Sequence, residues 1–196
     1  MKILIIGAEG TIGREIVKAL SDHDVIGASR KSGDVRVDIT QPGSIRDMYA
    51  KVGRVDAVIS AAGSGAWKPL AELTDEDFTY SLGYKLMGQV NVIRYGFDSV
   101  SDGGSITTTS GILARSPMPS SSAISLVNAG LEGFTRAAAL EAPRGIRVNV
   151  VSPPWVTETL IAMGAKDLSH ALPAATVAKA YVRSVTGKET GEVIEP

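Results

Sequence analysis

Short apolar runs alternate along the chain with longer segments in which apolar residues recur at helical spacing. The runs are rich in Val, Ile and Thr, and several are apolar throughout, as expected for strands that are covered on both faces. They predict strands over Ile3–Ile6, Val25–Ala28, Val35–Val37, Val55–Ile59, Ser105–Thr109 and Ile146–Val151, with a last edge strand over Glu192–Ile194. The segments between them predict helices over Thr11–Leu20, Ser44–Lys51, Thr74–Val100, Ser122–Ala142 and Ala174–Val185.

The regular alternation of strand and helix predicts an α/β fold. Strands joined through helices form right-handed crossovers, which give a parallel sheet with helices on both faces. The expected architecture is therefore a single doubly wound sheet between two helical layers, a three-layer αβα domain over residues 1–196. One irregular stretch, Ala114–Ser122, holds two prolines and four serines, and it predicts a loop ahead of a helix.

The composition removes several classes of function. With no cysteine among 196 residues, disulfides, thiolate-bound metals and thiol nucleophiles are excluded, and two histidines do not suffice for a histidine-rich metal site. A formal charge of −1 argues against a surface that neutralises nucleic-acid phosphates. No apolar run reaches the roughly 20 residues of a membrane span, and the first residues do not resemble a secretory signal. We expect a cytoplasmic protein with no bound metal and no nucleic-acid or membrane partner.

A glycine-rich turn directly follows the first predicted strand and has the sequence Gly7-Ala8-Glu9-Gly10-Thr11-Ile12-Gly13. A strand that turns at once into a helix leaves free N–H groups at the helix start, and glycines let a pyrophosphate approach that positive end. The spacing is GxxGxxG rather than the commoner GxGxxG. It predicts a dinucleotide site to which the turn contributes Gly7, Glu9, Gly10, Thr11, Ile12 and Gly13. The alternative is a plain strand-to-helix turn with incidental glycines.

The end of the second predicted strand indicates which dinucleotide binds. A site specific for NAD usually places Asp or Glu there, to accept hydrogen bonds from the ribose hydroxyls. The chain instead has Ser29, Arg30 and Lys31, and two cations suit a 2′-phosphate. These three residues therefore predict NADP(H) as the cofactor. The alternative is a solvated turn with two exposed cations.

Further motifs follow the glycine turn, namely Val37-Asp38-Ile39, Ser60-Ala61-Ala62-Gly63 and the run from Ala142 to Pro153. Together with that turn, they resemble the short-chain dehydrogenase/reductase family over nearly the whole chain. The resemblance implies a Rossmann-type fold, NAD(P)-dependent oxidation or reduction of a small organic substrate, and a homodimer or homotetramer. It also implies coenzyme contacts from Asp38, Ile39, Ala61, Ala62, Gly63, Pro153, Val156 and Thr157.

The chain departs from the resemblance at the family's catalytic residues, which are a Ser, a Tyr-x-x-x-Lys pair and often a supporting Asn. Alignment places Asn128 at the lysine and Ile124 at the tyrosine, one helical turn earlier. Lys85 stands at the supporting Asn. The serine falls at Ser110, although Gly111 lies at the more usual distance from position 124. Because isoleucine has no proton to give, the family's mechanism of ketone reduction does not carry over.

Three replacements for the missing proton donor are open. Lys85 acts as the acid if burial brings its pKa toward neutrality. Ser110 or Thr109 hydrogen-bonds the developing oxyanion while water gives the proton. Otherwise the substrate, for example an iminium or a conjugated enone, accepts hydride with little acid assistance. Asn128 is a further candidate that would orient a ribose hydroxyl, so the candidate catalytic residues are Ser110, Lys85 and Asn128.

Two functions follow from this departure. The first is an NADP(H)-dependent oxidoreductase that takes its proton from an unusual donor. The second is a protein that still binds NADP(H), has lost catalysis, and serves as a sensor or scaffold. Turnover with any acceptor would distinguish the first from the second.

Overall fold

A parallel sheet of seven strands forms the centre of the computed structural model, which describes residues 1–196. The strands are β1 (Lys2–Ile6), β2 (Asp24–Ser29), β3 (Val35–Arg36), β4 (Val55–Ser60), β5 (Val100–Thr109), β6 (Arg147–Val151) and β9 (Val193–Ile194). Their order is β3-β2-β1-β4-β5-β6-β9, and all neighbouring pairs are parallel. The direction of winding reverses between β1 and β4, which opens a crevice at the carboxyl ends of these strands.

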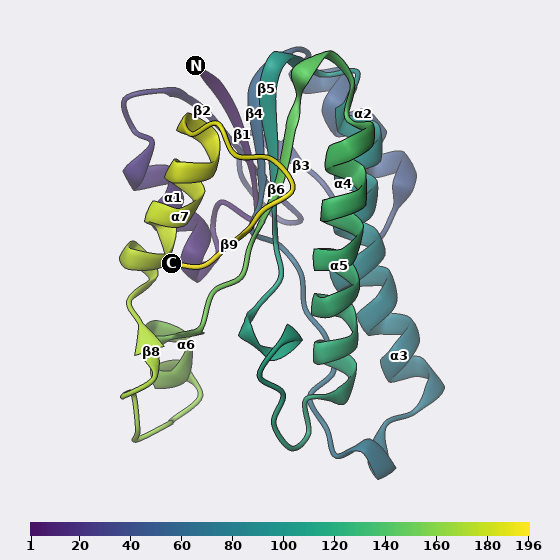
Figure 1. The fold of residues 1–196 in the computed structure, drawn as a ribbon, viewed down its shortest axis with the longest axis vertical. Coiled ribbons are helices and arrows are strands. Elements are labelled where there is room, and N and C mark those ends of the chain that lie inside the picture. The colour runs from purple at the N-terminus through teal and green to yellow at the C-terminus, as the bar shows by residue number, and fades with distance from the viewer.

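Helices cover both faces of the sheet, as Figure 1 shows. One layer holds α1 (Thr11–Ala19) and α7 (Ala174–Thr186), and the other holds α2 (Pro42–Val52), α4 (Gly88–Gly96) and α5 (Ser122–Glu141). Along β1, Ile3 and Ile5 belong to the core beneath α1 and α7, whereas Leu4 and Ile6 belong to the opposite core. Alternate side chains of one strand are thus buried on opposite faces, which is why the strand is apolar throughout. The predicted three-layer αβα architecture is confirmed.

The single helix predicted over Thr74–Val100 is wrong in two respects. The segment is divided into α3 (Asp75–Ser81), a π-helical turn η2 (Leu82–Met87) and α4, which ends at Gly96, and Val100 already begins β5. The predicted helix start at Thr74 is confirmed by a capping box, in which the Thr74 side chain accepts from the backbone N–H of Asp77. A Cβ at Gly96 would lie 2.7 Å from the Tyr49 hydroxyl, so the end of α4 packs closely on α2.

The region between Pro153 and Pro173 forms small elements that the hydrophobic pattern does not predict. They are β7 (Trp155–Val156), α6 (Thr157–Ala162) and β8 (Ala171–Leu172), and β7 pairs with β8 in a separate two-stranded sheet. They lie beyond the carboxyl ends of the central strands, at the lower side of Figure 1. Trp155 also meets Trp67 edge to face, with ring centroids 5.6 Å apart, which joins this region to the segment after β4.

Short 3-10 turns complete the chain at η1 (Leu70–Glu72), η3 (Ile112–Ala114) and η4 (Pro143–Gly145). Strand β5 begins five residues earlier than predicted, at Val100 instead of Ser105, while the predicted edge strand is confirmed as β9 beside β6. None of the helices combines the length and apolar character that a membrane crossing requires.

Candidate functional site

The glycine turn packs tightly at two of its glycines, Gly7 and Gly13, where a side chain cannot be accommodated. Gly7 has a φ of +84°, and a Cβ there would lie 3.0 Å from the backbone carbon of Ala61. At Gly13, a Cβ would lie 2.0 Å from the carbonyl oxygen of Gly7. These close approaches bring the start of α1 directly onto the ends of β1 and β4. Since no side chain caps α1 at Gly10, its first N–H groups are open to an anion.

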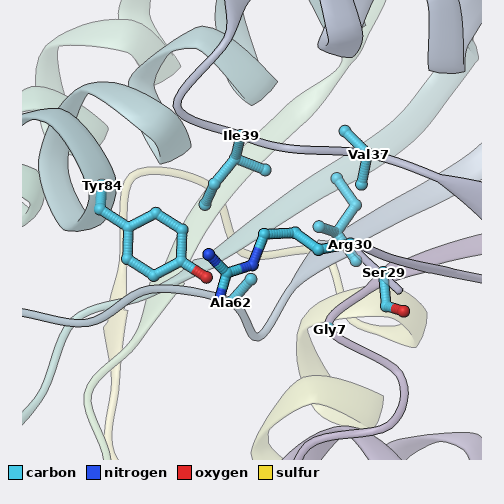
Figure 2. Close-up of a pocket in the computed structure, with 8 residues that line it drawn as sticks. Gly7, Ser29, Arg30, Val37, Ile39, Ala62 and Tyr84 are labelled. Atoms are coloured by element: carbon cyan, nitrogen blue, oxygen red, sulfur yellow. The ribbon is translucent and has the colours of Figure 1, made fainter. Parts of the chain in front are cut away.

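A hollow, here called the β2 hollow, opens beside this turn. It is lined by residues from the ends of β1 and β2, the segments after β3 and β4, and η2, namely Ile6, Gly7, Ser29, Arg30, Val37, Ile39, Ala62 and Tyr84. Figure 2 shows the Arg30 side chain extended across the hollow toward the Tyr84 ring. The guanidinium carbon lies 5.1 Å from the ring centroid, which is a cation–π contact. Five residues of the predicted coenzyme set thus line one hollow, namely Gly7, Ser29, Arg30, Ile39 and Ala62, and Tyr84 lines it with them.

Other predicted coenzyme residues do not line the β2 hollow. Glu9 accepts hydrogen bonds from the hydroxyls of Ser29, at 3.3 Å, and Ser32. Asp38 Oδ1 accepts two hydrogen bonds from the neighbouring Thr40, one from its backbone N–H at 2.9 Å and one from its hydroxyl at 2.7 Å. Lys31 is exposed. The three residues after β6 lie on the far side of the crevice: Pro153 follows the strand, Val156 belongs to β7 and Thr157 begins α6.

A second hollow, the Lys85 hollow, contains all three predicted catalytic residues. Its lining comes from η2, the segment after β5, η3, α5, the segment after β6, and β7. The lining residues are Lys85, Ser110, Gly111, Ile112, Leu113, Ile124, Asn128, Pro153, Pro154 and Trp155. Its walls are largely apolar. The half-buried Ile124 lines this hollow, where the resemblance expects a phenol.

Lys85 is the cation of this hollow, and only 8% of its surface is exposed. Its Nζ donates to the backbone carbonyl of Ser110 at 3.1 Å, which uses one of three N–H groups. No carboxylate pairs with it, and burial lowers the pKa of Lys85 to about 8. The lysine stem passes Gly63, where a Cβ would come within 2.8 Å of Lys85 Cδ. Gly63 therefore makes room for the buried lysine.

Asn128 leaves one polar atom without a partner. The residue is 2% exposed, and its Nδ2 makes a long contact of 3.5 Å with the carbonyl oxygen of Gly111. Its Oδ1 is buried and accepts no hydrogen bond. Because such an atom normally finds a donor, a ligand hydroxyl or N–H in the Lys85 hollow would satisfy it.

The hydroxyl of Ser110 is engaged by a buried carboxylate that the sequence analysis did not single out. Ser110 Oγ donates to Glu132 Oε1 at 2.9 Å, and Ser152 Oγ and Arg115 Nη1 donate to the same oxygen, each at 3.0 Å. Arg115 extends the cluster to Glu195 near the C-terminus, at 2.9 Å. One feature of the sequence could have indicated Glu132 as a site residue. It lies four residues after Asn128 and therefore on the same face of α5.

Gln89 fixes the end of β5 to the helix that carries Lys85. Its side-chain amide accepts from the backbone N–H of Thr109 at 2.8 Å and donates to the Thr109 carbonyl at 2.8 Å and the Lys85 carbonyl at 3.1 Å. The Thr109 hydroxyl instead lies near the Ser60 carbonyl and the Tyr181 hydroxyl, at 2.6 and 2.7 Å. The Thr109 hydroxyl, which the sequence suggested for oxyanion binding, therefore makes its hydrogen bonds with β4 and α7.

We predict that Glu132→Ala lowers the free energy of unfolding by about 3 kcal/mol, because Ser110, Ser152 and Arg115 lose a buried charged acceptor at once. Urea denaturation followed by circular dichroism measures this loss. Glu141→Ala, at an exposed position of the same helix, is the matched control, and a change within about 0.5 kcal/mol is expected there. Equal stability of the two variants would contradict an energetic role for the cluster.

The amino-acid sequence of this chain is similar to one family model and to several curated reductases. A family model described as enoyl-(acyl carrier protein) reductase matches residues 7–195. A hydroxynaphthalene reductase of Aspergillus fumigatus is 32% identical over 155 residues, which are 76% of this chain and 55% of that protein. The chain thus spans about half the length of the curated relatives that head the comparison.

Solved structures resemble the chain over its full length. A protein from Listeria innocua is 43% identical with a TM-score of 0.96, and the match covers 100% of this chain and 98% of that one. A small-chain dehydrogenase in complex with NADPH is 26% identical with a TM-score of 0.88, covering 100% and 96%. Because the family model spans almost the entire sequence and the solved structures superpose on all of it, the chain belongs to the short-chain dehydrogenase/reductase family.

Proposed function

We propose that the protein is an NADP(H)-dependent oxidoreductase that transfers hydride to or from a small organic substrate and takes its proton from a group other than tyrosine. Family membership and the NADPH complex of a structural relative support the coenzyme class. The apolar walls of the Lys85 hollow and the names of the hydroxynaphthalene reductases support a planar, apolar ketone or enone as substrate.

The residues at the crevice fit a nicotinamide dinucleotide. The glycine turn brings the start of α1 close to the ends of β1 and β4 and leaves the first N–H groups of α1 without a side-chain cap. The buried Oδ1 of Asn128 lacks a donor that a ribose hydroxyl would provide. Gly7 and Gly13 would hold the pyrophosphate, and Arg30 and Lys31 the 2′-phosphate. When bound, the coenzyme supplies or accepts the hydride.

The observation that carries the proposal is the buried, unpaired ammonium of Lys85 in the Lys85 hollow. Ile124 has no proton to give, and the proton of the Ser110 hydroxyl is donated to Glu132. Lys85 keeps two N–H groups free of protein partners, and with a pKa of about 8 it can lose a proton near neutral pH. In the reducing direction, an N–H bond of Lys85 Nζ breaks as an O–H bond forms on the substrate oxygen.

A second candidate function is coenzyme binding without turnover. It is favoured by one observation, that Ile124 and Asn128 occupy the positions that the resemblance gives to tyrosine and lysine. This candidate shares the coenzyme site and differs only at the Lys85 hollow. It predicts that NADPH binds but is not oxidised in the presence of aromatic ketones, enones, quinones or iminium compounds.

The pH dependence of the reaction tests the role of Lys85. An acid must carry its proton, so the reduction rate should be highest below the pKa of about 8 and fall about tenfold per pH unit above it. The reverse oxidation requires the neutral amine and should rise with pH until it levels off above the same value. Initial rates in both directions over about pH 6 to 10 measure these profiles. A flat reduction profile would exclude Lys85 as the acid.

Coenzyme affinity tests the assignment of NADP(H). Arg30→Ala should weaken NADPH binding about tenfold, because one charge-assisted contact with the 2′-phosphate is lost. NADH has no such phosphate and should be little affected. Isothermal titration calorimetry measures both dissociation constants. The control is Arg54→Ala, which removes an exposed cation that pairs with Asp102 instead; equal weakening of NADPH and NADH by Arg30→Ala would argue against the assignment.

A further inference from the structure

A carboxylate from the glycine turn lies at the end of β2, where the strand itself provides none. Glu9 Oε2 accepts from the hydroxyl of Ser29, the last residue of β2, at 3.3 Å, and from the hydroxyl of Ser32 just beyond. Ser29 lines the β2 hollow. The sequence shows Ser, Arg and Lys at this strand end, so the fold supplies from residue 9 the acidic group that the second strand lacks.

The position of this carboxylate would affect which group the adenosine ribose can carry at its 2′ position. In dinucleotide folds, an acidic group at the end of the second strand accepts hydrogen bonds from the ribose hydroxyls, whereas a 2′-phosphate needs cations there. A carboxylate attracts the 2′-hydroxyl of NADH and repels the 2′-phosphate of NADPH. Glu9 therefore acts against the cations that follow β2.

No cation neutralises Glu9. Its two contacts are with serine hydroxyls, and it takes part in none of the seven ion pairs of the molecule. The nearby guanidinium of Arg30 instead lies over the Tyr84 ring, as Figure 2 shows. The negative charge of Glu9 therefore remains available to a bound nucleotide.

We propose that Glu9 determines coenzyme specificity by opposing the 2′-phosphate, so that the preference for NADPH is smaller than Arg30 and Lys31 alone would give and NADH also binds. This inference rests on the proposed function, since it concerns the same coenzyme site. The Ser32 hydroxyl holds the carboxylate in place for this role, while the Ser29 hydroxyl makes its shorter hydrogen bond, of 2.6 Å, to the Ser32 carbonyl.

Dissociation constants for NADPH and NADH, measured by calorimetry on Glu9→Gln and the unchanged protein, test the inference. Glu9→Gln removes the charge and keeps the size of the side chain. NADPH should bind about tenfold tighter, equivalent to about 1.4 kcal/mol, which is the order expected for one charge beside a phosphate at a protein surface. NADH should bind no tighter than before, because its hydroxyls lose a charged acceptor. Glu9 is exposed, so the Glu9→Gln variant should fold.

Two further variants make the result specific. Asp22→Asn removes one exposed negative charge at the turn after α1, and it should leave the ratio of the two dissociation constants unchanged. Glu9→Asp keeps the charge and should retain the ratio of the unchanged protein. A Glu9→Gln variant that alters both affinities by the same factor, or that weakens NADPH, would overturn this inference alone. Failure of the unchanged protein to bind either coenzyme would overturn the proposed function, and this inference with it.

Discussion

Replacement of Lys85 by methionine should lower kcat for reduction about 100- to 1000-fold, the range expected when a general acid is removed. Methionine keeps an unbranched apolar stem beside Gly63 but has no proton to donate. Stopped-flow measurement of NADPH oxidation, with the best acceptor found among aromatic ketones, enones and quinones, gives kcat and KM separately. The effect should fall on kcat, because the proton moves in the chemical step.

The matched control for this variant is Lys68→Met, which removes an exposed lysine that pairs with Asp77 and should leave kcat unchanged. NADPH affinity should also stay within about twofold in Lys85→Met, since the β2 hollow and the glycine turn are untouched. Full activity of Lys85→Met would mean that the proton comes from water or that the substrate needs none. The two remaining explanations, Ser110-assisted oxyanion binding and an electrophilic substrate, would then be tested with Ser110→Ala.

Substitution of Gly13 by alanine should abolish measurable coenzyme binding, with dissociation constants for NADPH and NADH both raised more than about 100-fold. A Cβ at this position would lie 2.0 Å from the Gly7 carbonyl oxygen, so α1 would have to move away from β1. That shift would misplace the N–H groups proposed to bind the pyrophosphate and would cost about 3 kcal/mol of folding stability through overpacking. Calorimetric titration and urea denaturation measure the two effects.

Gly43→Ala is the control for this glycine. It lies in the first turn of α2, and a Cβ there would meet nothing within 4 Å. Alanine should be neutral or stabilising by up to about 1 kcal/mol, because it reduces the freedom of the unfolded chain. Normal coenzyme affinity in Gly13→Ala would show that the strand-to-helix turn is not the phosphate site.

The central architecture was predictable because its buried strands are recognisable from their amino-acid sequence alone. A strand buried on both faces is apolar throughout, as Ile3–Ile6 shows, and the alternation of such runs with helical segments indicates a parallel sheet. The helix predicted over Thr74–Val100 was wrong because it contains a π-helical turn and ends at Gly96. A π-helical turn is confined to one turn, Leu82–Met87, which is too short to be recognised from the apolar spacing of the whole segment. The beginning of β5 was missed because Ser101–Ser105 contains no apolar residue.

Lys85, Ser110 and Asn128, which line the Lys85 hollow, were predicted from the sequence as site residues, but Glu132, Tyr84 and the contacts between the side chains were not. The alignment singled out Lys85 and Ser110, but burial of the lysine depends on Gly63, which comes from another segment of the chain. Glu132 has the sequence features of an ordinary helical residue, and its three donors come from the ends of β5 and β6 and from η3. The position of Glu9 beside Ser29 likewise results from the fold, since the two residues are 20 positions apart. Contacts between residues that lie far apart in the chain produce no recognisable pattern in the local amino-acid sequence.

The π-helical turn η2 places two consecutive residues in different hollows, with Tyr84 at the β2 hollow and Lys85 at the Lys85 hollow. An insertion or deletion within Leu82–Met87 would rotate both side chains about the helix axis at once. The proposed roles of these hollows in nucleotide recognition and proton donation would therefore both depend on one turn of backbone. A substitution of Tyr84 or Lys85 would change one hollow at a time, whereas a change of chain length in this turn would alter both together.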